Sequence, residues 1–143
     1  MARFEQVQHG PAPGRPKCIV ERAIHFIGSG KATREELSGS TITITSLGAR
    51  EDINAAAHSY GGVVLHDVIN NVFAHKAIEK GADGLIPVAA GAGGHASVKS
   101  PFAMVAEIRE WFGGPVALSG SISSGGAVLA AQAMGADFAY IGS

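Results

Sequence analysis

The chain has 143 residues, of which 46% are hydrophobic and 16% are charged, and its net charge is −1. This length suffices for one domain, and so small a net charge gives no electrostatic basis for binding nucleic acid or an anionic membrane. One cysteine, Cys18, excludes an internal disulfide framework, and no apolar run approaches the ~20 residues that cross a bilayer. We therefore expect a cytoplasmic protein without membrane or nucleic-acid partners.

Residues 1–40 form an unassigned N-terminal segment. Three of the six prolines lie in His9–Pro16, which is typical of a loop or a tail. The apolar spacing in Cys18–Ile27 fits a short amphipathic helix that Gly28 would end. This pattern is too weak to assign an element, so the segment carries no structural prediction.

From Thr41 onward, strand and helix patterns alternate. Strands are expected at 41–46, 63–66, 84–89, 115–119 and 138–141, and helices at 50–60, 72–80, 101–112 and 125–134. A glycine suited to end the helix follows each one, at positions 61, 81, 113 and 135. Such βα units form a parallel sheet with right-handed crossovers. This α/β pattern fits either a small open doubly wound sheet or the later part of a (β/α)8 TIM barrel.

One βα unit is longer than the others. The four capping glycines are 20, 32 and 22 residues apart, and the excess falls in the loop Gly91–Ser100, between a strand and a helix. In α/β folds, the side on which strands end and helices begin is the ligand side. Ser100 and Pro101 suit the N-cap and the first position of the next helix. We therefore place the candidate active site at this loop.

His95 is the candidate catalytic residue of the loop. It stands in the sequence G-A-G-G-H-A (91–96), where small neighbours offer nothing to bury its imidazole. Histidine exchanges protons near neutral pH and is suited to act as a general base toward a carbon acid. The alternative is a surface histidine without a role. His66, at a strand end, is a weaker candidate, and His58 and His75 are expected in packing or at the surface.

A second feature is a pair of strand ends made of small residues. Ser119, Gly120 and Ser121 follow one strand, and Gly142 and Ser143 follow the last. Backbone N–H groups at two adjacent strand ends form an anion cradle, and barrels often bind phosphate after strands seven and eight. The alternative is a pair of ordinary tight turns. The sequence has no metal-ligand motif, no G-x-G-x-x-G fingerprint and no nucleophile elbow.

Several spaced motifs together point to a family. They are V-L-H-D-V (64–68), K-A-I-E-K-G-A-D-G-L-I (76–86), G-A-G-G-H-A (91–96), S-P-F-A-M-V (100–105), L-S-G-S-I (118–122) and A-A-Q-A-M-G-A-D-F-A-Y-I-G-S (130–143). In this order they resemble the nitronate monooxygenases, formerly called 2-nitropropane dioxygenases, which are FMN flavoproteins on a TIM barrel. The resemblance covers residues 41–143.

This resemblance implies a role for each candidate residue. His95 matches the catalytic histidine of the family's G-G-H motif, and Gly93 and Gly94 would lie along the flavin. The remaining cofactor-binding positions, around the FMN phosphate, are Ser119, Gly120, Ser121, Gly142 and Ser143. No metal is implied. The five expected strands would be strands four to eight, so residues 41–143 would be a partial TIM-barrel FMN-binding domain in a chain truncated at both ends.

The implied activity is an oxidoreductase reaction. FMN and dioxygen would oxidise an alkyl nitronate or nitroalkane to a carbonyl compound and nitrite, with His95 acting as the base toward a neutral nitroalkane or positioning the nitronate anion. Three alternatives stay open. They are an FMN-dependent enoyl-acyl carrier protein reductase, a non-catalytic barrel fragment that pairs as a homodimer, and a barrel fragment of the phosphate-sugar isomerase type.

Overall fold

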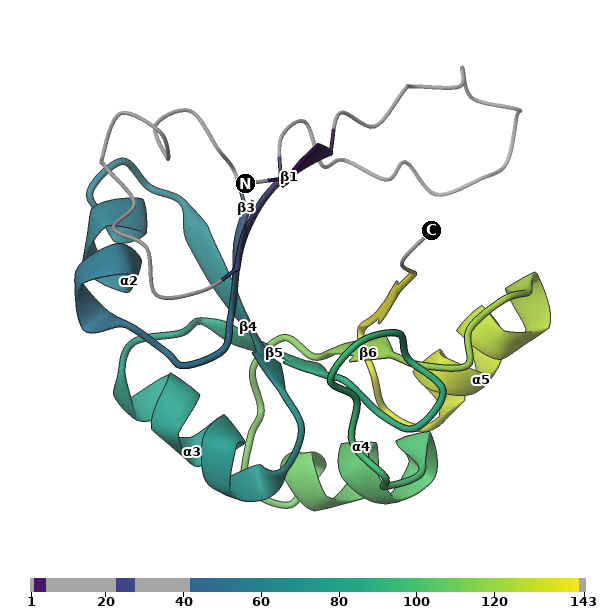
Figure 1. Cartoon of the computed structure of the whole chain (residues 1–143). Coiled ribbons are helices and arrows are strands. Elements are labelled where there is room, and N and C mark those ends of the chain that lie inside the picture. Colours follow the sequence, from purple (N-terminus) through teal and green to yellow (C-terminus); the bar gives the residue numbers. More distant parts are fainter. Residues whose placement is uncertain (1, 5–22, 28–41, 142–143) are drawn as a thin grey trace.

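A computed structural model describes residues 2–4, 23–27 and 42–141. The strands are β1 (Ala2–Phe4), β2 (Ala23–Ile27), β3 (Ile42–Ser46), β4 (Val63–Val68), β5 (Gly84–Pro87), β6 (Ala117–Ser119) and β7 (Phe138–Tyr140). The helices are α2 (Glu51–His58), α3 (Asn71–Glu79), α4 (Pro101–Arg109) and α5 (Gly125–Ala133). The strands follow an arc, and the helices lie along its convex side (Figure 1).

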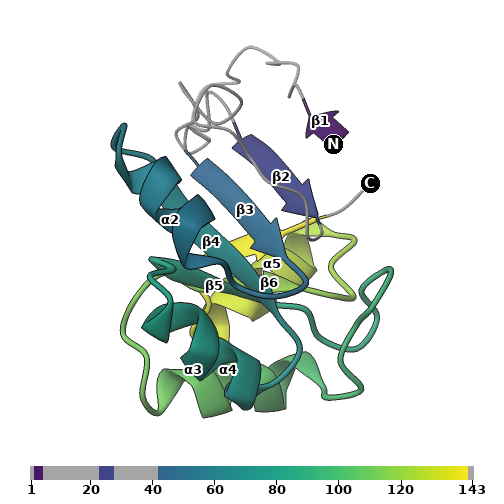
Figure 2. The same cartoon turned by 60° about the vertical axis from the view of Figure 1, so that its left-hand side comes forward.

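The sheet is parallel from β2 to β7. The strand order is β1-β2-β3-β4-β5, with β1 antiparallel to β2 and the later pairs parallel, and β6 pairs with β7 in parallel. Two parallel bridges, Leu85 to Val116 and Val88 to Ser119, join β5 to β6. In the turned view, β2, β3 and β4 run side by side in one direction (Figure 2). The predicted α/β class with a parallel sheet is confirmed.

The elements expected after Thr41 are present, and their ends differ from the expected positions by at most three residues. The amphipathic helix considered for Cys18–Ile27 is wrong over residues 23–27, which form strand β2. This strand lies in parallel register with β3, from the pair Ala23–Ile42 to the pair Ile27–Ser46. Pairing with a neighbouring strand, which local spacing does not report, decides the conformation of this segment.

Successive residues of the strands alternate between two buried faces. On the helix side, Val64, Val68 and Leu85 belong to a large apolar cluster that also includes residues of α2, α3, α4 and α5. On the concave side, Ile44 and Ile86 belong to a smaller cluster. Because helices cover one face and side chains fill the other, the strands read as nearly continuous apolar runs in the sequence.

Two of the glycines that end helices, Gly81 and Gly135, belong to a repeated Gly-Ala-Asp turn. Asp83 accepts a hydrogen bond from the amide of Val64 (2.7 Å), and its carboxylate pairs with His58 (2.8 Å). Asp137 repeats this arrangement in the last βα unit, where it accepts from the amide of Val116 (2.8 Å). Each turn therefore fixes one helix end to the start of a strand. Within the described residues, no helix is long and apolar enough to cross a membrane.

Candidate active site

The loop between β5 and α4 carries His95 on an exposed tip. Backbone hydrogen bonds close its neck, because Ala90 donates to the carbonyl of Lys99 (2.9 Å) and Ser97 donates to the carbonyl of Val88 (2.9 Å). The expectation that nothing buries the imidazole of His95 is confirmed. The chain therefore presents this histidine from a pinned loop at the carboxyl end of the sheet.

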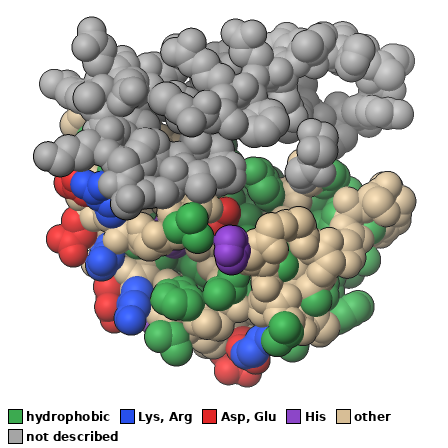
Figure 3. Space-filling view, viewed as in Figure 1, with side chains coloured by type: hydrophobic (Ala, Val, Ile, Leu, Met, Phe, Trp, Pro, Cys, Tyr) green, Lys and Arg blue, Asp and Glu red, His purple; other side chains and the backbone are tan. Residues whose placement is uncertain are grey.

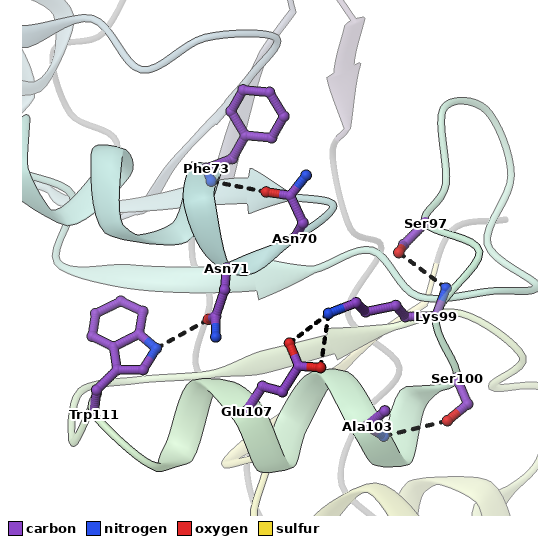
Figure 4. Close-up of polar contacts among 9 residues, drawn as sticks. All are labelled: Asn70, Asn71, Phe73, Ser97, Lys99, Ser100, Ala103, Glu107 and Trp111. Carbon is purple, nitrogen blue, oxygen red and sulfur yellow. Dashed lines mark hydrogen bonds and ion pairs between the residues drawn. The ribbon is translucent and has the colours of Figure 1, made fainter.

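Helix α4 holds the returning side of the same loop (Figure 4). Lys99 forms an ion pair with both carboxylate oxygens of Glu107, at 2.6 and 2.7 Å, and the Lys99 amide donates to the side chain of Ser97. Ser100 accepts from the amide of Ala103 (3.3 Å), which is the predicted N-cap. These contacts tie the loop to the rigid start of a helix.

A pocket of about 670 Å³ crosses the carboxyl ends of β3, β4 and β5. It is lined by Ser46, Leu47, Gly48, Ala49, His66, Asp67, Ile69, Phe73, Lys76, Lys80, Val88, Gly93, Gly94 and His95. The pocket brings the predicted catalytic residue and both predicted flavin-facing glycines together. In the space-filling view, a histidine side chain lies near the centre of the described surface, next to hydrophobic side chains (Figure 3).

His66 lies in the wall of this pocket. Its side chain is 3% exposed, and its Nδ1 lies 2.5 Å from the hydroxyl of Thr45. Burial lowers the pKa of His66, the charge of Asp67 opposes that shift, and Lys80 adds to it. Burial therefore favours the neutral form of the imidazole. The sequence indicated a site role for His66 less strongly than for His95, and the structure places both along one pocket.

Asp67 and Ser46 also line the pocket, and the sequence analysis did not select them. The hydroxyl of Ser46 donates to the Asp67 carboxylate across neighbouring strands. Burial and the charge of Asp67 raise the pKa of Tyr140. The available signal was the polar pair His66-Asp67 near the end of an otherwise apolar strand, where side chains often face a ligand site.

The described residues among those predicted around the phosphate, Ser119, Gly120 and Ser121, are not in the lining of this pocket. Gly120 and Ser121 line a separate small pocket of about 160 Å³ between the start of α4 and one side of α5. Ser119 is buried at the end of β6. Gly142 and Ser143 fall outside the described residues. The structure therefore places Gly93, Gly94 and His95 at one pocket, and Gly120 and Ser121 at another.

The comparison with protein families gives the decisive observation. The family model described as FMN-dependent dehydrogenase matches residues 26–143. The chain belongs to this family. Its cofactor is FMN, as the motif resemblance implied, and its family is one of flavin oxidoreductases. The match begins inside β2, earlier than the start of the resemblance at Thr41.

Two solved structures share the fold of this chain. A FabK mutant from Thermotoga maritima matches with a TM-score of 0.71 and 22% identity, over 82% of this chain and 41% of the other. Nitroalkane oxidase from Streptomyces ansochromogenes matches with a TM-score of 0.66 and 25% identity, over 75% of this chain and 36% of the other. The chain therefore spans about two fifths of the length of these proteins. No curated protein matches this sequence.

The described residues of this chain fit a flat cofactor with a phosphate. A Cβ atom on Gly93 or Gly94 would meet no described atom within 4 Å, so bare backbone borders open space beside the large pocket. Helix α5 begins next to the small pocket, and Ser124 caps it by accepting from the amide of Ala127 (3.2 Å). A helix amino end of this kind favours a phosphate.

Proposed function

We propose that this chain is the FMN-binding part of an enzyme that oxidises alkyl nitronates or nitroalkanes to a carbonyl compound and nitrite. The observation that carries the proposal is the placement of His95. It stands exposed on a glycine-rich, pinned loop beside a pocket of about 670 Å³ at the carboxyl ends of three parallel strands. The likeness to a nitroalkane oxidase at 25% identity supports the choice of substrate.

The proposal includes a TIM-type barrel, in which the arc from β2 to β7 corresponds to six consecutive parallel strands. In such a barrel the functional loops follow the strands, as the His95 loop does here. Gly93 and Gly94 would border the flavin ring, and Gly120 with the amino end of α5 would hold the phosphate. Gly142 and Ser143 keep the phosphate role that the resemblance implies.

His95 would take a proton from the carbon that bears the nitro group. The C–H bond breaks, the proton moves to a ring nitrogen of His95, and the electron pair remains on the substrate as a nitronate anion. Lys76 and Lys80 line the same pocket and favour an anion there. When bound, FMN supplies the electron transfer that leads from the nitronate to dioxygen.

The test compares two substrates in a histidine variant. We expect His95→Ala to lower kcat/KM for a neutral nitroalkane by about 100-fold or more, because a general base contributes on that scale. Turnover of a preformed nitronate should change little, because its proton is already lost. Nitrite release from the FMN-loaded protein is the measurement. The control is His58→Gln, which changes a histidine at the carboxyl end of α2 that does not line the pocket. Equal activity of His95→Ala and the control on the neutral nitroalkane would refute the base assignment.

A second candidate function follows from the fold likeness to FabK. An FMN-dependent enoyl-acyl carrier protein reductase needs a nicotinamide cofactor as electron donor, whereas nitronate oxidation does not. The same protein should therefore be supplied with NADH or NADPH and an enoyl thioester. Consumption of the nicotinamide that depends on the thioester, without nitrite release in the first assay, would select this reductase over the nitronate reaction.

A further inference from the structure

Two loops at the carboxyl end of the sheet contact each other through backbone atoms. The amide of Ser121 donates to the carbonyl of Gly91 (3.3 Å), and the hydroxyl of Ser121 donates to the carbonyl of Ala90 (3.1 Å). Beneath them, the amide of Ala89 donates to the carbonyl of Ser119 (2.8 Å). Ser121 therefore directs both of its donors toward the first residues of the His95 loop.

The backbone of Ser121 is in a conformation that a serine rarely adopts. Its φ is +56°, in the left-handed region, where a residue with a Cβ atom is disfavoured relative to glycine. A glycine would relieve this conformation but would lack the hydroxyl. The hydroxyl of this serine bonds to the carbonyl of Ala90, and that bond offsets the backbone cost.

Gly91 shows how closely the two loops approach. A Cβ atom on Gly91 would lie 1.9 Å from the hydroxyl oxygen of Ser121, and a Cβ atom on Gly120 would lie 2.8 Å from the carbonyl oxygen of Ala89. Glycine at both positions permits contact between backbones. The start of the His95 loop is therefore set by the turn before α5, while Lys99 and Glu107 set its end.

We propose that Ser121 is a positioning residue for His95. It fixes the carbonyl groups of Ala90 and Gly91, and through them the direction in which the loop carries the imidazole over the pocket. This differs from the phosphate-binding role that the resemblance implied, because the amide and the hydroxyl of Ser121 both serve the loop. The inference rests on the proposed function of His95.

The test uses Ser121→Gly, Ser121→Ala and the control Ser123→Gly, which changes an exposed serine of the same turn. Amide exchange of Ala90, Ala92 and Ser97 in the FMN-free protein reports the loop without any activity. We expect exchange about tenfold faster in both Ser121 variants than in the control.

Ser121→Gly should nevertheless be at least as stable as the parent protein, because glycine relieves the left-handed backbone. Ser121→Ala keeps that backbone cost and should be the less stable of the two.

The loaded enzyme gives the second readout. In Ser121→Gly we expect kcat/KM for a neutral nitroalkane to fall about tenfold, with unchanged FMN affinity and unchanged turnover of a preformed nitronate, since a misplaced base affects only proton removal. Loop exchange equal to that of Ser123→Gly would overturn the proposal. Lost FMN affinity with unchanged loop exchange would also overturn it and make Ser121 a cofactor ligand. If no variant has nitroalkane activity, the exchange data still decide the positioning role.

Discussion

At the scale of single residues, the buried side chain of His66 forms part of the wall of the large pocket. His66 contacts Thr45, and Lys80 reaches the same region, where its ammonium donates to the carbonyl of Ala49 (3.0 Å). A positive charge beside a desolvated imidazole disfavours protonation. Protonation of His66 therefore costs free energy in the folded protein and not in the unfolded chain.

This cost predicts how the free energy of unfolding depends on pH. The pKa of His66 in the folded state is lowered below 6.5, mainly by burial. Above that value, both states keep the imidazole neutral. As the pH falls below it, the unfolded chain binds a proton first, so stability is lost until the lowered pKa is reached. Urea unfolding at a series of pH values should show His66→Gln losing less stability than the parent on acidification. Parallel pH profiles of the two proteins would contradict this account.

At the scale of elements, two Gly-Ala-Asp turns connect α3 to β5 and α5 to β7. Arg109, at the end of α4, donates to the carbonyls of Gly114 (2.7 Å) and Gly135 (2.7 Å) and to the carboxylate of Asp137 (2.5 Å). Asp137 in turn accepts from the amide of Val116, a residue with no exposed surface. The Asp137 carboxylate thus accepts from the backbone amide of Val116 and also pairs with Arg109 at the end of α4.

We expect Asp137→Ala to lower the free energy of unfolding by about 1–3 kcal/mol, because the buried amide of Val116 loses its acceptor. Desolvation would raise the pKa of Asp137, but the bonds from Val116 and Arg109 outweigh it and lower the pKa. This contribution is therefore present at neutral pH and lost as the pH falls through the lowered pKa. Denaturant unfolding measures the change. Asp52→Ala, in an exposed ion pair with Arg50, is the control and should have little effect.

At the scale of the whole molecule, the sheet places two different surfaces at one end. The large pocket with His95 lies over β3, β4 and β5, and the small pocket with Gly120 lies next to the start of α5. Ser121 connects them through the first residues of the His95 loop. In the function we propose, FMN spans both pockets, with its phosphate at the amino end of α5.

Titration of the purified protein with flavins tests this arrangement. We expect near-stoichiometric binding of FMN, seen as a change in the flavin absorbance bands, and a rise in Tm that grows with FMN concentration. A free FMN concentration of about 100 times Kd should add about 2.7 kcal/mol to the free energy of unfolding. Riboflavin, which lacks the phosphate, should bind more weakly and shift Tm less. Equal effects of the two flavins would contradict a phosphate site at α5, and a colourless protein with an unshifted Tm would contradict FMN binding by this chain.

Local sequence patterns determined most of the secondary structure of this protein after Thr41 and the exposure of His95. The period of apolar residues predicted the strands and helices after Thr41, and the small residues around His95 predicted its exposure, because both depend on neighbours along the chain. The motif spacing also indicated an FMN family. Only the tertiary structure decided that Ala23–Ile27 is a strand, that His66 and Asp67 join His95 in one pocket, and that Ser121 contacts the loop before it. These features depend on pairing and contact between residues distant in the sequence, which local periodicity does not encode.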